Sequence, residues 1–250
     1  MWRKRALRCI FCGHWKAAGR WIIAGIGALT SPVVLADDIR LSSFYIPLMV
    51  ESRDKGVFIE LVKEIESRIP HTIDLTVYPA NRTLNYFHKS RVDGFFPALD
   101  VMVQKEIQRS TPIYIKQDFA FVRAGSRLPK NISELRGMKV GLTQGYAYSD
   151  DLMNVQAQFI FAHDDVSNIR KLDLGRLDVF LVEEKSGIKA LKLSGVSDIS
   201  YDSQHPLSQQ DVYFAFQNTD KGYEYAKMFS DALADMKTDG SFARIMAQAQ

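Results

Sequence analysis

The sequence predicts an α/β fold built around a mostly parallel sheet. Two observations carry this prediction: strand-like apolar segments recur along the chain, and segments with apolar residues at helical spacing lie between them. This alternation is typical of parallel sheets, because neighbouring parallel strands need a crossover connection, usually a helix.

The first half of the chain shows this alternation most clearly. We expect strands at residues 39–44, 72–78 and 91–96, and helices that begin near residues 57 and 80. In the first helix Phe58, Leu61 and Ile65 recur at helical spacing, and Pro70 ends it. Three strands joined by two helices predict a parallel unit.

The second half repeats the architecture without repeating the sequence. We expect strands at residues 118–123, 139–142, 158–162, 177–182 and 212–216. We expect helices at residues 168–174, 223–236 and 242–248, and a short helix before residue 138. Gly175 and Gly240 each follow a predicted helix, a position where glycine favours a stop.

Residues 1–36 have the pattern of a secretory signal peptide. A basic region without acidic residues precedes the apolar stretch 21–29, and the small side chains before residue 37 predict cleavage after Ala36. The alternative is a membrane anchor, but the apolar stretch is short against the roughly 20 residues that spanning needs. We therefore expect a periplasmic protein.

Removing this segment reverses the charge of the chain. The 36 residues hold six of the 32 basic residues, which leaves 26 against 29 acidic residues and a net charge of −3. No nucleic-acid partner is expected, because the basic excess belongs to targeting. Cys9 and Cys12 leave with the segment, so we expect no disulfide and no thiolate metal site, and we predict neither a metal nor a cofactor.

A glycine motif follows the strand at residues 138–140. Gly141 and Gly145 bracket Leu142, Thr143 and Gln144, and a second helix is expected to start beyond them. Such a turn can expose backbone N–H groups at a helix N-terminus, where an anionic group binds. The alternative is an ordinary strand-to-helix connection, which also favours glycine and threonine.

Six segments in order resemble the family of periplasmic solute-binding proteins that serve polar amino-acid ABC importers, family 3 of these proteins. They are GVFIELVKEI from Gly56, SRVDGFF from Ser90, STPIY from Ser110, the segment from Ile132, LGRLDVFLVEE from Leu174 and DALADMKTDGSFARIM from Asp231. The resemblance implies a type II binding-protein fold, with two α/β lobes joined by two crossing strands and a ligand between them. Residues 37–116 with 211–250 would form lobe 1, and residues 117–210 would form lobe 2.

The resemblance also suggests ligand-binding residues on lobe 1. Tyr45 follows the first strand, where relatives place an aromatic ring over the ligand, although a tyrosine packed on its own lobe is the alternative. Glu60 matches an acidic position of the family, but we prefer to interpret it as a solvated first-turn acid. Arg82 stands in the first turn of a helix, where a cation is unfavourable unless it faces an anion or a nearby acid, or lies on the surface. We expect Asp93 to be structural.

On lobe 2 the strongest candidate is Glu183, which follows an apolar strand. Relatives place a carboxylate there that pairs with a ligand ammonium, and a solvated loop acid is the alternative. Glu184 could take this role by a register slip. Thr143, Gln144, Gly145 and Tyr146 would offer backbone and side-chain hydrogen bonds to an anionic group.

The chain departs from the family at the group that holds a ligand carboxylate. Amino-acid binders carry an arginine seven residues before the serine at Ser110, and this chain has Val103 there. Ser90 stands where relatives have glycine. Either Arg82 or Arg109 replaces the missing arginine, or the ligand is not a standard α-amino acid.

The resemblance predicts a monomeric, non-enzymatic protein that captures a small polar solute, either an amino acid or a related amine or carboxylate. Its partner would be an inner-membrane ABC permease. The alternative is an extracytoplasmic sensor acting on a membrane signalling partner, and the genes beside this one would separate the two. A periplasmic dehydratase on the same fold is less favoured, because no histidine pair has metal spacing and no catalytic Ser/His/Asp order stands out.

Overall fold

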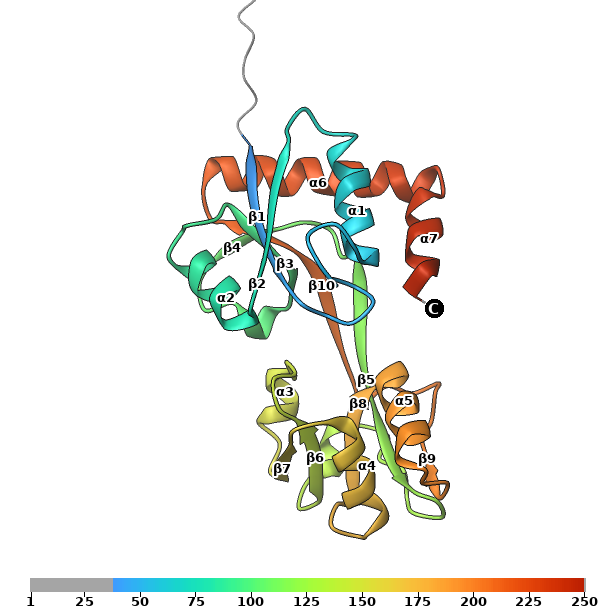
Figure 1. Ribbon diagram of the computed structural model, residues 1–250. Coiled ribbons are helices and arrows are strands. Elements are labelled where there is room, and N and C mark those ends of the chain that lie inside the picture. Colours follow the sequence, from blue (N-terminus) through green and yellow to red (C-terminus); the bar gives the residue numbers. More distant parts are fainter. Residues whose placement is uncertain (1–37, 250) are drawn as a thin grey trace, which may run out of the picture. The chain divides into compact units, whose positions relative to one another are not determined.

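The computed structural model describes residues 38–249 of the chain, so the predicted signal peptide, its cleavage site and both cysteines lie outside the described residues. The observed elements confirm the α/β class (Figure 1). In chain order the first are β1 (Ile39–Phe44), α1 (Val57–Glu66), β2 (Ile73–Tyr78), α2 (Ala80–His88), β3 (Gly94–Ala98), β4 (Ile107–Arg109) and β5 (Tyr114–Arg123). Then follow β6 (Lys139–Thr143), α3 (Asp150–Met153), β7 (Gln158–Ala162), α4 (Asp165–Asp173), β8 (Val179–Glu183), α5 (Glu184–Ser194), β9 (Ile199–Ser200), β10 (Ser208–Gln217), α6 (Asp220–Thr238) and α7 (Ser241–Met246).

The strands pair in the order β2-β1-β3-β10-β5-β8-β6-β7, with β4 on β10 and β9 on β5. Strand β1 is parallel to β2 and β3, and β6 is parallel to β7 and β8. The ten-residue strands β5 and β10 join these two parallel groups, because they pair with each other between residues 114–118 and 208–212. The segments expected to connect the lobes therefore lie in one antiparallel pair. The lobe boundaries themselves stay a prediction.

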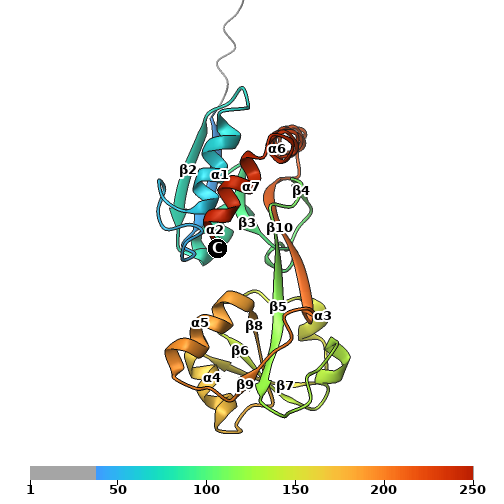
Figure 2. The same ribbon diagram turned by 90° about the vertical axis from the view of Figure 1, so that its right-hand side faces the viewer.

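Alternate residues of the apolar strands enter cores on opposite faces of the sheet. In β8, Leu181 packs with Leu135 and Leu152 on one face, whereas Phe180 packs with residues of α4 and α5 on the other. Helices α4 and α5 lie next to each other (Figure 2). In β10, Phe214 packs against α6, and Tyr213 packs on the face that α2 covers. Strands buried on both faces read as continuous apolar runs, which is the pattern seen in the sequence.

Most predicted elements are confirmed, and three were missed. Helix α5 contains Gly187, which lowers its apparent helical preference. That glycine is required by packing, because a Cβ there would lie 2.4 Å from Cζ of Phe121. The short strands β4 and β9 have three and two residues and no periodicity to read. Ser90, in the family's glycine position, takes a left-handed φ of 53° that glycine adopts more readily.

Asp93 has the structural role expected for it. It accepts hydrogen bonds from the backbone N–H of Arg40 at 2.9 Å and from the guanidinium of Arg40 at 2.7 and 3.1 Å. Burial alone would raise the pKa of Asp93, but the hydrogen bonds and charge of Arg40 outweigh it and hold the pKa below its ordinary 3.8. The pair ties β1 to the turn before β3.

This pair predicts a contribution to acid stability. Because the pKa of Asp93 is lower in the folded state, its stabilising effect is present above the unfolded pKa and is lost as pH falls through the folded pKa. We expect Asp93→Asn to lower stability at pH 7 and to flatten the loss of stability below about pH 4. Urea unfolding across pH 2–7 measures this, with exposed Asp74→Asn as the control. An Asp93→Asn curve parallel to the wild-type curve would contradict the assignment.

Candidate functional site

The carboxyl ends of three parallel strands in the second lobe bring polar side chains together. Thr143 is the last residue of β6, Glu183 is the last residue of β8, and Asp165 opens α4 just after β7. With Tyr146, which follows β6, these residues form what we call the lobe-2 edge. Ligands of open α/β sheets bind outside the carboxyl ends of the strands, so this position is suited to binding.

Asp165 is the centre of the lobe-2 edge. Its Oδ1 accepts a hydrogen bond from the hydroxyl of Thr143 at 2.5 Å, and its Oδ2 accepts one from the hydroxyl of Tyr146 at 2.9 Å. Buried Asn168 donates to Oγ1 of Thr143 at 3.1 Å and to the carbonyl of Leu142 at 3.0 Å. The Thr143 hydroxyl therefore accepts a hydrogen bond from Asn168 and donates one to Asp165.

Glu183 has a local role that the sequence did not indicate. Its carboxylate accepts the backbone N–H of Ser186 at 3.0 Å and so caps the N-terminus of α5. With the hydroxyl of Tyr114 as a second partner, part of the acceptor capacity of the carboxylate is still unused. Tyr114 lies beside it: burial and then the Glu183 charge raise the pKa of Tyr114 to about 12. Burial and Asp165 likewise raise the pKa of Tyr146. Both phenols therefore keep their protons at neutral pH.

The glycine motif differs from its prediction in two ways. Gly141 lies inside β6 rather than in a turn, and the next helix, α3, starts only at Asp150 and has four residues. The backbone N–H of Thr143 donates to the hydroxyl of Tyr148 at 2.8 Å, that of Gln144 to a carbonyl of β7 at 2.9 Å, and that of Tyr146 to the carbonyl of Thr143 at 3.3 Å. The protein itself uses these three amides, so they are not open to a ligand here, and the expected anion seat on this turn stays a prediction.

Close packing explains the glycine at position 141. A Cβ there would lie 2.4 Å from Cδ1 of Leu177 and 3.0 Å from Oδ1 of Asn168. We expect Gly141→Ala to displace Asn168 from Thr143 and to cost about 1–3 kcal/mol of unfolding free energy, as overpacked substitutions do. Denaturant unfolding measures this, with exposed Lys139→Ala in the same strand as the control. A Gly141→Ala protein as stable as the control would refute this packing account.

The candidates on the first lobe lie near the carboxyl ends of β1 and β2. Tyr45 follows β1 and is 63% exposed. Arg82, in the first turn of α2, is exposed and lies over the rings of Tyr78 and Tyr86, 5.5 and 5.6 Å from their centroids. Within residues 38–249 no acidic side chain pairs with Arg82, so a nearby acid does not explain its position. Its position is explained by cation–π contact with the two aromatic rings.

Two other candidates are already paired. Glu60 is in the first turn of α1 and contacts Lys63 at 2.8 Å, which fits the interpretation as a solvated first-turn acid. Arg109, one of the two possible replacements for the missing arginine, contacts Asp100 at 2.6 Å and lies 5.1 Å from the ring of Tyr213. Arg109 is therefore neutralised within its own lobe.

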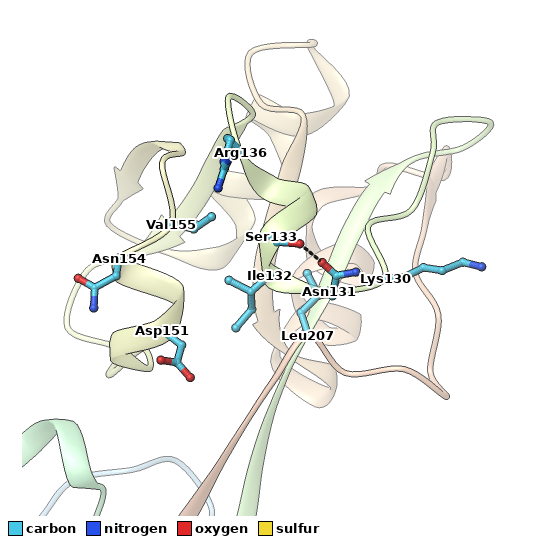
Figure 3. Close-up of a pocket in the computed structure, with 9 residues that line it drawn as sticks. All are labelled: Lys130, Asn131, Ile132, Ser133, Arg136, Asp151, Asn154, Val155 and Leu207. Carbon is cyan, nitrogen blue, oxygen red and sulfur yellow. Dashed lines mark hydrogen bonds between the residues drawn. The ribbon is translucent and has the colours of Figure 1, made fainter.

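Two surface depressions lie away from the predicted ligand residues. A wide, shallow depression of about 650 Å³ is lined mainly by exposed side chains (Figure 3): Lys130, Asn131, Ile132, Ser133, Arg136, Asp151, Asn154, Val155 and Leu207. A smaller one of about 360 Å³ lies at the start of α6 and includes Asp93 and Lys105. Neither is lined by a predicted ligand residue. We favour the lobe-2 edge on its chemistry, because the larger depression is open to solvent and its lining side chains are not fixed by burial.

The described part of the chain shows neither a metal-binding cluster nor a membrane-spanning helix. Between residues 38 and 249, no three His, Cys, Asp or Glu side chains are grouped so that they could hold a metal ion. No helix in the same range is long and apolar enough to cross a membrane.

The sequence missed Asp165, Asn168, Tyr148 and Tyr114. The rule that pointed to Glu183, a carboxylate just after a strand, applies equally to Asp165 after β7. Nothing local marks Asn168 and Tyr114, because their contacts join segments far apart in the sequence. Tyr148 lies close to Thr143 in the sequence, but no sequence pattern shows that its hydroxyl meets that amide.

Comparison with known proteins supports the fold. No protein-family profile matches the chain, and no curated protein sequence matches it. Among solved structures, the GluR0 ligand-binding core from Nostoc punctiforme in complex with L-glutamate has a TM-score of 0.63 at 17% identity, over 83% of this chain and 96% of that chain. An ancestral arginine-binding protein bound to arginine has a TM-score of 0.60 at 15% identity, over 84% and 97%. A histidine kinase sensor domain with similarity to periplasmic binding proteins has a TM-score of 0.62 at 19% identity, over 84% and 95%. These matches confirm the predicted two-lobe binding-protein fold.

Proposed function

We propose that this chain is a periplasmic solute-binding protein of family 3. It would capture a small polar solute bearing an amino group between its two lobes and deliver it to an ABC importer in the inner membrane. The observation that carries the proposal is the lobe-2 edge, where Asp165 and Glu183 stand at the carboxyl ends of parallel strands. Across from them we place Tyr45 and Arg82 of lobe 1.

The fold supports this choice of function. The solved structures reported above are a ligand-binding core, an arginine-binding protein and a sensor domain, rather than enzymes. Hinge closure of two lobes around a solute is the motion that such a fold permits. Incubation with prephenate-like acids tests the catalytic alternative. If the protein turns over such an acid and Glu183→Gln abolishes that turnover, the proposed function would have to change from solute binding to catalysis.

A thermal-shift screen of the whole chain tests the proposal. Amino acids, amines and small carboxylates are each added to the purified protein, and a ligand at 100 times its dissociation constant should add about 2.7 kcal/mol of stability. We expect stabilisation by at least one solute with an amino group. A flat response to the whole panel would reject solute capture.

Signal sensing is the second candidate, and the resemblance to a histidine kinase sensor domain favours it. The two roles share one binding site, so they differ only in the membrane partner. If the chain serves transport, solute-loaded protein should stimulate ATP hydrolysis by vesicles that contain the ABC permease encoded beside its gene. Stimulation of a membrane kinase instead would identify a sensor.

A further inference from the structure

The hydroxyl of Tyr148 occupies the place where the sequence predicted a ligand anion. It accepts the backbone N–H of Thr143 at 2.8 Å, at the carboxyl end of β6. Tyr148 is only 6% exposed, so this hydrogen bond is shielded from water. The first amide of the turn is therefore satisfied before any solute arrives.

The position of Tyr148 is fixed on every side. Its ring packs in the core formed with Leu142 and Leu152. The ammonium of Lys116 lies 5.4 Å from the ring centroid, and Asp118 holds that ammonium at 2.5 and 2.6 Å. A solute would have to disrupt this packing to displace the hydroxyl.

Four further hydrogen-bond donors of this turn and of the lobe-2 edge are also used internally. The hydroxyl protons of Thr143 and Tyr146 both point to Asp165. The amides of Gln144 and Tyr146 donate to backbone carbonyls. What the edge offers to a solute is mainly acceptor oxygen atoms, together with the negative charges of Asp165 and Glu183.

Lys116, whose ammonium lies over the ring of Tyr148, is not free to compensate these charges. Lys116 is paired with Asp118, and on the other lobe Arg109 is paired with Asp100. A solute carboxylate placed here would face two carboxylates, and the Thr143 amide would not be open to it. A cationic group rich in N–H donors would find acceptors and opposite charge.

We propose that Tyr148 is a specificity-determining residue: by occupying the Thr143 amide, it makes the site select organic cations without a carboxylate over the corresponding amino acids. This inference rests on the proposed function and names its solute class. Arg82 could still bind a carboxylate from lobe 1, and the titrations described next would reveal that case.

Calorimetric titration with matched pairs of solutes tests the inference. The pairs are agmatine with arginine, putrescine with ornithine, and tyramine with tyrosine, in which the two members differ only by the carboxylate. We expect the amine of the best-binding pair to bind the whole wild-type chain at least about tenfold tighter, the effect of one hydrogen bond to a charged group.

Tyr148→Phe frees the Thr143 amide and leaves the ring in place. We expect it to reduce the preference for the amine by about tenfold, chiefly through tighter amino-acid binding. The matched control is Tyr201→Phe, which removes a hydroxyl bonded to Glu184 at 3.0 Å and should leave the preference unchanged. Should Tyr148→Phe not fold, the wild-type comparison still tests the solute class, and a crystal structure of the wild-type protein with its best amino acid tests Tyr148, because a carboxylate on the Thr143 amide would overturn its role.

The outcomes separate the two claims. Amino acids that bind as well as or better than their amines, for example through Arg82, overturn the inference and leave solute capture standing. An unchanged preference in folded Tyr148→Phe removes Tyr148 from the explanation. Failure of every member of every pair to bind overturns capture of an amino-group solute, and the inference with it.

Discussion

Replacing Asp118 by alanine is expected to lower the free energy of unfolding by about 3–5 kcal/mol, which is the usual cost of breaking a buried ion pair from one side. The Asp118 side chain is 1% exposed and Lys116 is 16% exposed. Asp118 also accepts the hydroxyl of Ser208 at 3.0 Å, across the β5–β10 pair. Alanine would leave a partly buried ammonium and a hydroxyl without their partner.

The matched control is Asp231→Ala. Asp231 contacts Lys227 at 2.6 Å, but both side chains are more than 60% exposed. Exposed pairs contribute about 0–1 kcal/mol, so we expect this substitution to change stability by less than about 1 kcal/mol. Urea unfolding of both variants measures the difference. Equal losses in the two variants would mean that the Lys116–Asp118 pair does not stabilise the strands that join the lobes.

Replacing Asp165 by asparagine is expected to weaken solute binding about a hundredfold. The substitution keeps the size of the side chain but removes a charge that Thr143 and Tyr146 orient. Losing one partner of a desolvated charge pair costs about 2–5 kcal/mol in binding, so a hundredfold effect lies at the lower end. We expect Glu183→Gln to have a similar effect, because its remaining acceptor positions face the same solute.

Glu60→Gln is the control for these binding measurements. Glu60 is paired with Lys63, and we expect its affinity to remain within about twofold of wild type, in the range of exposed pairs. Calorimetric titration with the best solute of the thermal-shift screen gives all four affinities. If Glu60→Gln lowers solute affinity as much as Asp165→Asn does, the solute does not bind specifically at the lobe-2 edge.

The sequence predicted the fold well because its signals are local. Continuous apolar runs such as residues 177–182 identify strands buried on both faces, and the glycines at positions 175 and 240 mark chain reversals, with φ of 69° and 80°. Helix α5 was not predicted, because Gly187 weakens its local helical pattern. The glycine is needed there for close packing against Phe121. That contact is tertiary and leaves no trace in the neighbouring residues.

The site could be predicted only in part, for the same reason. Glu183 was proposed because it follows an apolar strand, and Thr143 and Tyr146 were proposed from the glycine motif after another strand. Their place at the lobe-2 edge follows from strand order. The spacing of Gly141 and Gly145 suggested an open turn, but the spacing of glycines does not distinguish a turn from a tightly packed strand. Tyr148 could not be assigned, because its role depends on a hydroxyl meeting one particular amide.

The most direct test of the account is the crystal structure of the whole chain with its tightest-binding amine. We predict that the cationic nitrogen lies within hydrogen-bond distance, about 3 Å, of a carboxylate oxygen of Asp165 or Glu183. The Tyr148 hydroxyl should still accept the hydrogen bond from the Thr143 amide. A solute bound in the depression beside Lys130 and Arg136, or one whose anionic group has displaced Tyr148 from that amide, would contradict it.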